Sequence, residues 1–213
     1  MPLNPGPLSQ NIQLAIEVVA TFAFALSGIL EGARKRLDAV GVCVVAFLAA
    51  FGGGTLRDLL LDVRPFFWVK YIELLWAVFV LCILAMLFMR QRHFEFTERA
   101  IQWPDALGLG LFTAAGVFQA IAMQMPPLVA VFMGVITGVF GGVLRDIVCN
   151  EIPNAFKDHR PYAICAFVGG WVYIGLRELG CPAYINMLGC VTATLGLRAW
   201  SVWKDIRLPQ WRS

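Results

Sequence analysis

The segment GGGTLRD at residues 52–58 returns as GGVLRD at residues 141–146, with the two motifs in register at a spacing of 88 positions. The match extends in both directions at the same spacing and without a gap. Further pairs that are identical or keep their character are Glu17 with Asp105, Phe24 with Phe112, Gly28 with Gly116, Pro65 with Pro153, and Phe79-Val80 with Phe167-Val168. The chain therefore contains two copies of one sequence unit.

The composition around these motifs is that of a membrane protein. Of 213 residues, 59% are hydrophobic and 15% are charged, and the mean hydropathy is +0.72. Soluble proteins usually carry about 25% charged residues. Seven apolar segments each approach the roughly 20 residues that a helix needs to cross a bilayer. They cover residues 12–33, 38–63, 66–89, 104–123, 127–150, 161–176 and 183–203.

Each sequence unit contains three apolar segments, and an odd number makes the second copy enter the membrane from the opposite side. We therefore predict an all-α membrane protein with seven transmembrane helices, built from two inverted three-helix repeats plus a seventh helix. Inverted repeats place the working site near the midplane, where the repeats meet. The predicted divisions are a lead-in at 1–11, repeat 1 at 12–90, a cytoplasmic connection at 91–102, repeat 2 at 103–178, the seventh helix at 179–203 and a cytoplasmic tail at 204–213.

Lysine and arginine divide unevenly between the two faces that this topology creates. One face receives eleven of the basic residues between and after the segments, and the other receives only Arg64, Lys70 and Arg177. Cytoplasmic loops carry the excess of Lys and Arg in membrane proteins. We therefore predict that the N-terminus lies outside and the C-terminus lies in the cytoplasm.

Glycines interrupt the second and fifth segments near their centres. Consecutive glycines weaken a helix, and a broken helix presents carbonyl groups that suit cations and N–H groups that suit anions. Packing of helices through small residues is the other interpretation. The glycines lie near the centres of their segments, recur in both repeats and are followed by charged residues. These three features favour broken helices, with pore hinges at Gly52, Gly53, Gly54, Gly141 and Gly142.

Arg57, Asp58, Arg145 and Asp146 follow these glycines at membrane depth and are candidate pore-lining or gating charges. A charge at the centre of a bilayer costs at least about 2.5–3.5 kcal/mol, so each of these side chains should face protein or water. Adjacent residues on a helix do not face each other. We therefore predict that Arg57 pairs with the fifth helix, or with carbonyls freed at the opposite break, rather than with Asp58.

Other side chains carry weaker signals. Ser27, Thr113 and Thr137 are candidate pore-lining polar groups, although a hydrogen bond to their own helix is the commoner role of such residues. The six cysteines form no CxxC pair and the two histidines fall in polar loops. We therefore predict no disulfide framework, no metal site and no cofactor, and the absence of a nucleophile–base set argues against an enzyme.

The repeated motif resembles the bacterial members of the TRIC family, the trimeric intracellular cation channels. The resemblance covers residues 12–203 and is carried by GGGTLRD (52–58), GGVLRD (141–146), NEIP (150–153), FALSG (24–28) and DALGLGLFTAAG (105–116). It implies a homotrimer with one pore in each protomer, framed by the first, second, fourth and fifth helices. Phe140 or Val143 stands where a third glycine would complete the second hinge. The lysine-containing lipid-binding motif of animal members is missing, so phosphoinositide regulation is not carried over.

Two function classes remain open from the sequence. The resemblance favours a channel for a monovalent cation, potassium, in a bacterial inner membrane. The alternative is a secondary transporter of glycine or another small zwitterion, which an inverted repeat with two broken helices also suits. A purely structural protein or receptor would leave the intramembrane charges unexplained. Membrane lipids and further copies of the chain are the expected partners, with no nucleic acid and no soluble protein.

Overall fold

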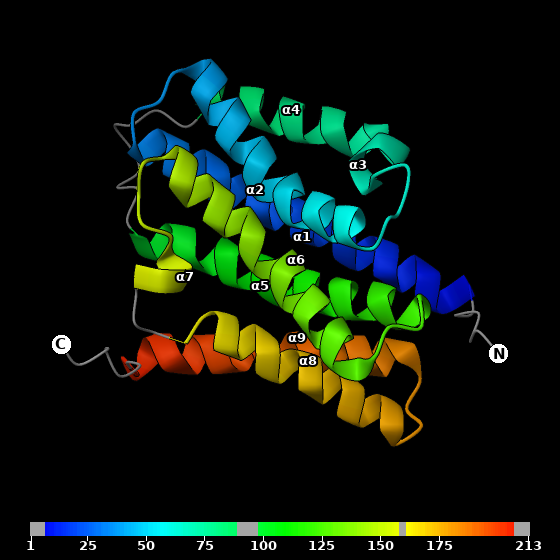
Figure 1. The fold of residues 1–213 in the computed structure, drawn as a ribbon. Helices are drawn as coiled ribbons and strands as arrows, with labels where there is room; N and C mark the ends of the chain where they lie inside the picture. The colour runs from blue at the N-terminus through cyan, green and yellow to red at the C-terminus, as the bar shows by residue number, and fades with distance from the viewer. Residues whose placement is uncertain (1–6, 89–97, 158–160, 207–213) are drawn as a thin grey trace.

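The computed structural model describes residues 7–88, 98–157 and 161–206, and within these ranges the chain is all helical (Figure 1). The longer helices are α1 (Pro7–Arg34), α2 (Ala39–Leu60), α4 (Ile72–Phe88), α5 (Glu98–Ala122), α6 (Pro127–Val148), α8 (Ala163–Glu178) and α9 (Ala183–Trp203). Two short helices, α3 (Phe67–Lys70) and α7 (Asn154–Lys157), lie in the connections. Each of the seven predicted apolar segments thus overlaps one of the seven longer helices.

The predicted divisions can be compared with the helices only within the described ranges. Most of the lead-in, residues 91–97 of the connection and residues 207–213 of the tail lie outside these ranges. α1 and α5 both begin before the predicted spans, because their first turns are polar and extend beyond the apolar stretch. α5 therefore includes residues 98–102 of the predicted connection.

Matching helix ends repeat in the two halves. Asp62 ends α2 and Asn150 ends α6, and both have positive φ values, of 52° and 55°. Asp and Asn tolerate this left-handed conformation better than most residues. The N–H of the next residue then bonds back to a carbonyl in the last turn of the helix, at 2.8 Å from Val63 to Asp58 and at 2.9 Å from Glu151 to Asp146. The repeat in sequence is therefore also a repeat in backbone geometry.

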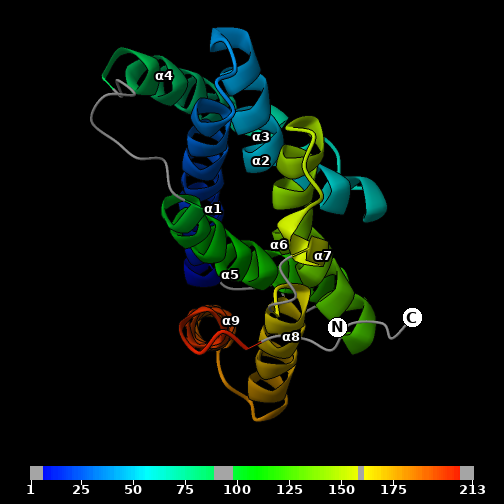
Figure 2. The same ribbon diagram turned by 90° about the vertical axis from the view of Figure 1, so that its left-hand side faces the viewer.

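The two repeats run in opposite directions. In Figure 1, α1 and α5 are antiparallel, and so are α2 and α6. α1 packs against α2 and α5, and α6 packs against both α2 and α5, as Figure 2 also shows. The rings of Phe24 and Phe112, which are equivalent in the two repeats, stack with centroids 5.6 Å apart. This arrangement is that of an approximate two-fold axis, as predicted from three helices in each repeat.

Four helices are long and apolar enough to cross a membrane by length and composition: Leu8–Arg34, Ala39–Leu60, Ala100–Ala122 and Pro127–Val148. They belong to α1, α2, α5 and α6, the four helices at the centre of the two-fold arrangement. α4 is apolar but has only 17 residues. Among the described helices, α8 and α9 fall outside this set of four, so the count of seven crossings stays a prediction.

The helices are not interrupted at the glycines. α2 is one helix from Ala39 to Leu60, and α6 is one helix from Pro127 to Val148. The predicted breaks are therefore not found, because a glycine inside a helix costs only about 1 kcal/mol relative to alanine. Close contact explains two of the glycines. A methyl group at Gly53 would overlap the carbonyl oxygen of Thr137, and one at Gly141 would overlap that of Ala49. These glycines let α2 and α6 cross backbone to backbone.

Candidate functional site

The guanidinium of Arg57 lies buried between two carboxylates, and we call these three residues the first cluster. Arg57 Nη1 donates to Glu17 Oε1 at 2.8 Å, and Nε donates to Asp58 Oδ1 at 2.9 Å. The Nη2 atom lies 2.8 Å from the same Asp58 oxygen. All three side chains are at most 4% exposed. Glu17 is on α1 and 40 residues before Arg57, so the cluster ties α1 to the end of α2.

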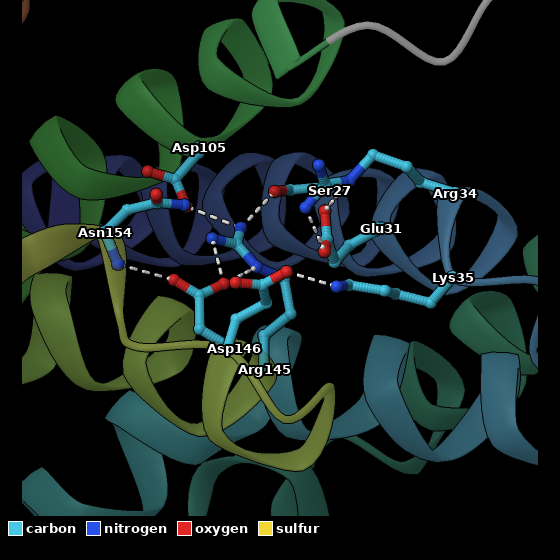
Figure 3. Close-up of polar contacts among 9 residues, drawn as sticks. Ser27, Glu31, Arg34, Lys35, Asp105, Arg145, Asp146 and Asn154 are labelled. Atoms are coloured by element: carbon cyan, nitrogen blue, oxygen red, sulfur yellow. Dashed lines mark hydrogen bonds and ion pairs between the residues drawn. The ribbon is translucent and has the colours of Figure 1, made fainter. Parts of the chain in front are cut away.

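The second cluster repeats this arrangement with Arg145, Asp105 and Asp146 (Figure 3). Arg145 Nη1 donates to Asp105 Oδ1 at 2.6 Å, and Nε donates to Asp146 Oδ1 at 2.8 Å. Asp105 is on α5, again 40 residues before its arginine. The second cluster therefore ties α5 to the end of α6.

The prediction about the partners of Arg57 is wrong. It pairs with Asp58, its neighbour in sequence, and with the first helix of its own repeat rather than with α6. The rule that adjacent residues face apart holds for short side chains. A long arginine can turn its fork of N–H groups back toward a neighbouring carboxylate. The alignment of Glu17 with Asp105 was the signal in the sequence that could have identified the true partners.

Each aspartate also holds the connection that follows its helix. Asp58 Oδ2 accepts the backbone N–H of Phe67 at 2.9 Å, at the start of α3. Asp146 Oδ2 accepts the backbone N–H of Asn154 at 2.8 Å, at the start of α7. A carboxylate in this position satisfies a helix N–H group that has no partner within the helix. The aspartates thus link the arginines to the short helices in the connections.

The two clusters differ in their outer contacts. In the second cluster, Ser27 accepts a short hydrogen bond from Arg145, and the Tyr162 hydroxyl donates to Asp105 Oδ2 at 2.6 Å. Ala115 and Leu74 stand at the equivalent positions of the other repeat. The second cluster is therefore joined to α1 and to the start of α8 by contacts that the first cluster cannot make.

The first cluster instead has amide contacts. The Gln13 amide donates to Glu17 Oε1 at 3.3 Å and to Gln119 Oε1 at 3.0 Å. These bonds connect α1 with the end of α5. The first cluster is therefore joined to α5 through amide groups, whereas the second is joined to its neighbours through two hydroxyl groups.

Charge and position suit the clusters to cations. Each cluster sets one guanidinium against two carboxyl groups, a formal charge of −1. Arg57 and Arg145 each follow the Gly53–Gly141 crossing by four residues, which is about 6 Å along a helix. Because α2 and α6 are antiparallel, the clusters lie on opposite sides of that crossing. A cation that passed along these helices would meet a net negative group on each side.

A cavity adjoins each cluster. The larger has a volume of about 380 Å³ and is lined by Glu17, Arg57 and Asp58 together with residues from the α3 region and the end of α5. The smaller has a volume of about 50 Å³ and is lined by Asp105, Arg145 and Asp146 together with residues from the end of α1. The protein is therefore more open at the first cluster than at the second.

The structure brings together some of the predicted site residues and separates others. Ser27 joins the second cluster. Thr113 and Thr137 are fully buried where α5 meets α6, and each donates at 2.6 Å to a carbonyl of its own helix, that of Leu109 and that of Met133. This is the commoner role that the sequence left open for them. Within the described residues, no group of three or more His, Cys, Asp or Glu side chains is arranged to hold a metal ion.

Glycine positions near the clusters differ in the space around them. A methyl group at Gly54 would have no atom within 4 Å, whereas one at Gly142 would lie 3.1 Å from Asp105 Oδ1 and 3.3 Å from the Tyr162 hydroxyl. At Gly52, it would meet only the end of the Leu144 side chain. Close packing therefore accounts for Gly53 and Gly141, and Gly142 makes room for the second cluster, but packing does not account for Gly54.

Sequence comparisons identify relatives along most of the chain. The family described as Glycine transporter matches twice, over residues 14–90 and 102–178. The inner membrane protein YadS of Escherichia coli K12 is 40% identical over 199 residues, which make up 91% of this chain and 93% of that protein. A UPF0126 membrane protein of Vibrio cholerae is 34% identical over 206 residues, 95% of this chain and 84% of that protein.

Solved structures of similar fold are TRIC channels. One is the TRIC trimeric intracellular cation channel orthologue from Rhodobacter sphaeroides, with a TM-score of 0.85 and 28% identity over 92% of this chain and 99% of that one. Another, from a study of conductance through TRIC cation channels, has a TM-score of 0.82 and 30% identity over 93% of this chain and 97% of that one.

Proposed function

This chain belongs to the TRIC family, as one of its bacterial members, and on that premise we propose that it is a channel for monovalent cations, with potassium as the main permeant ion. The observation that supports this proposal most is the pair of buried clusters, each with a formal charge of −1, on opposite sides of the α2–α6 crossing. A low-dielectric setting strengthens the attraction between such a group and a passing cation.

The ion path that we propose lies within one protomer and is framed by α1, α2, α5 and α6. The cavity of about 380 Å³ at the first cluster forms one vestibule, and the cavity of about 50 Å³ at the second forms the other. Between them lie the α2–α6 crossing and the stacked rings of Phe24 and Phe112. Because the cluster at each end of the path has a formal charge of −1, an anion that passed either cluster would be repelled.

The assembly and topology that we propose follow the family. Seven helices cross the inner membrane, with the N-terminus outside, and three copies of the chain form the channel. The similar structure from Rhodobacter sphaeroides is that of a trimeric channel. The uncovered apolar side chains of α4 support contact with lipid or another copy, since Trp76 is 61% exposed and Phe88 is 78% exposed.

Transport of glycine is the weaker proposal for this geometry. It depended on broken helices whose free carbonyl and N–H ends could hold a zwitterion, and α2 and α6 are continuous. The charged groups of both clusters are also occupied by one another. A channel needs no site that binds its ion tightly, because conduction requires the ion to leave as easily as it enters.

The two functions can be separated in liposomes that contain the purified protein. With a potassium gradient, we expect a rapid change in membrane potential, reported by a voltage-sensitive dye, and no accumulation of labelled glycine. Protein-free liposomes provide the control for leak. Saturable glycine uptake without potassium-dependent changes in potential would overturn the channel and establish the transporter.

A further inference from the structure

The two cavities are equivalent by the repeat, but their walls differ in charge. We call the cavity next to the first cluster the α3-side mouth and the cavity next to the second cluster the α7-side mouth. At a spacing of 88 positions, Val63, Gln119 and Ala122 of the α3-side mouth correspond to Glu151, Glu31 and Arg34 of the α7-side mouth. Three uncharged side chains in one mouth are thus replaced by three charged ones in the other.

These charged side chains form ion pairs at the α7-side mouth, one between two segments and one within α1. The ammonium group of Lys35, which is labelled in Figure 3, bonds to Glu151 Oε1, and this ion pair joins the loop after α1 to the loop after α6. Beside it, Arg34 holds Glu31 through two bonds, of 2.7 and 3.0 Å. Met123 is the counterpart of Lys35 in the other repeat and cannot form such a bridge. The mouth with the pairs has about 50 Å³ of space, and the mouth without them has about 380 Å³.

We propose that the Lys35–Glu151 pair forms a latch that closes the α7-side mouth beside the Arg34–Glu31 pair of α1, and that cations reach the second cluster when the Lys35–Glu151 pair opens. This inference rests on the proposed function in that it concerns the same ion path. The two side chains of the bridge are 28% and 30% exposed. Pairs with such exposure shift an equilibrium by only about two- to five-fold, so this latch opens and closes readily.

Opening of the latch also changes the charge of the mouth. The cavity is lined by four carboxyl groups, from Glu31, Asp105, Asp146 and Glu151, and by three arginines, Arg34, Arg145 and Arg198. Lys35 balances this excess while it is bound to Glu151. When Lys35 moves away, the wall has a formal charge of −1, which favours entry of a cation over an anion. The same movement therefore opens the mouth and prepares it for the permeant ion.

The latch can be tested without measuring conduction, because Cys149 is a buried cysteine between Asp146 of the second cluster and Glu151 of the latch. Its thiol is in the electrostatic range of Glu31 and Lys35, and the residue is 7% exposed. Full-length protein in lipid nanodiscs is treated with a water-soluble, cationic methanethiosulfonate, and the modified fraction at Cys149 is followed by peptide mass spectrometry. Lys35→Met and Glu151→Val carry the residues of the other mouth. Arg177→Met removes a charge from an exposed ion pair elsewhere and serves as the control.

We expect Cys149 to react about two- to five-fold faster in Lys35→Met and Glu151→Val, and at the wild-type rate in Arg177→Met. The exchanged variant K35E/E151K keeps a bridge of reversed sense and should return the rate toward that of wild type. Equal rates in wild type and both single variants would overturn the latch, as would an equal increase in Arg177→Met. If the wild-type protein conducts no ions, the proposed function fails while the Cys149 rates still decide the latch.

Discussion

At the scale of single residues, the stability of this protein depends on how two buried arginines are satisfied. Arg57 and Arg145 are each about 2–4% exposed in their side chains, and each bonds to two carboxylates from different positions in its repeat. Removal of one partner from a buried ion pair leaves an uncompensated charge, which costs more than the pair itself contributes. The clusters are therefore sites where we expect substitution to affect folding, whatever its effect on ion flux.

Arg145→Met tests this reasoning directly. The substitution leaves Asp105 and Asp146 close together without a counter-charge, so we expect a loss of about 3–5 kcal/mol in the free energy of unfolding. Unfolding in mixed detergent–SDS micelles measures this change. Arg145→Lys keeps the charge but cannot contact both carboxylates with a planar fork, so an intermediate loss is expected. A variant Arg145→Met as stable as wild type would contradict the assignment of the cluster.

The aspartates can be tested together, since the repeat makes them equivalent. In the double variant D58N/D146N each arginine loses one of its two charged partners, and we expect impaired folding or reduced ion flux. We expect the free energy of unfolding to fall by about 1–3 kcal/mol for each charged hydrogen-bond partner that is removed. Yield of folded protein by size exclusion and potassium flux in liposomes provide the two measurements. Wild-type values for both would count against any role of these carboxylates.

At the scale of the helices, the glycines of α2 and α6 serve the crossing of two helices rather than a break. Gly53 and Gly141 each face a carbonyl of the opposite helix, and both helices continue through them. The sequence indicated two interpretations, and only the partner helix could decide between them. Which backbone atom faces a glycine depends on residues 84 or more positions away, such as Thr137 opposite Gly53, and local helix propensity carries no information about that contact.

Gly53→Ala and Gly54→Ala form a matched pair for this crossing. The first adds a methyl group against the Thr137 carbonyl, and we expect a loss of about 1–3 kcal/mol in the free energy of unfolding, as is typical of overpacking. The second adds a methyl group where no atom lies within 4 Å. It should leave stability unchanged or raise it by up to about 1 kcal/mol, because alanine favours a helix. Equal effects of the two changes on stability would show that the crossing is not as close as described.

Several parts of the fold and the site were predictable from the sequence for identifiable reasons. The spacing of 88 positions and three apolar segments per unit predicted two halves of opposite direction, as found for α1 with α5 and α2 with α6. The sequence also predicted that the four charged residues after the glycines have partners, as they do, but it did not identify those partners. Glu17 and Asp105 lie 40 residues from their arginines, and helical periodicity relates only residues that are much closer in the sequence. The bridge from Lys35 to Glu151 spans 116 positions and has no counterpart in the other repeat, so the repeat itself gave no sign of it.

At the scale of the whole molecule, the two cavities differ although the sequence units that build them are repeated. The α3-side mouth is the larger and is lined partly by uncharged residues, and the α7-side mouth is the smaller and lies beside the Lys35–Glu151 ion pair. α9 adds to this asymmetry, because it packs against α5 and α8 and lies outside the repeat. The repeated helices are thus arranged symmetrically, whereas the Lys35–Glu151 ion pair is found only at the α7-side mouth.

Assembly is the next prediction at this scale. We expect chemical cross-linking of the protein in native membranes to yield species up to three copies of the chain. The apolar side chains left uncovered on the single chain, such as Trp76 and Phe88, need lipid or another copy to cover them. Cross-linking that stops at two copies, with the same result in nanodiscs of different lipids, would contradict the trimer.

The measurement that tests the central claim most directly is a recording from single molecules of the purified protein in a planar bilayer, with different potassium chloride concentrations on the two sides. A cation channel gives discrete current steps, and the current reverses near the equilibrium potential of potassium rather than that of chloride. Replacement of potassium by a large organic cation on one side should abolish the current carried from that side. Absence of current steps from protein shown to be folded, or reversal at the chloride potential, would contradict the account.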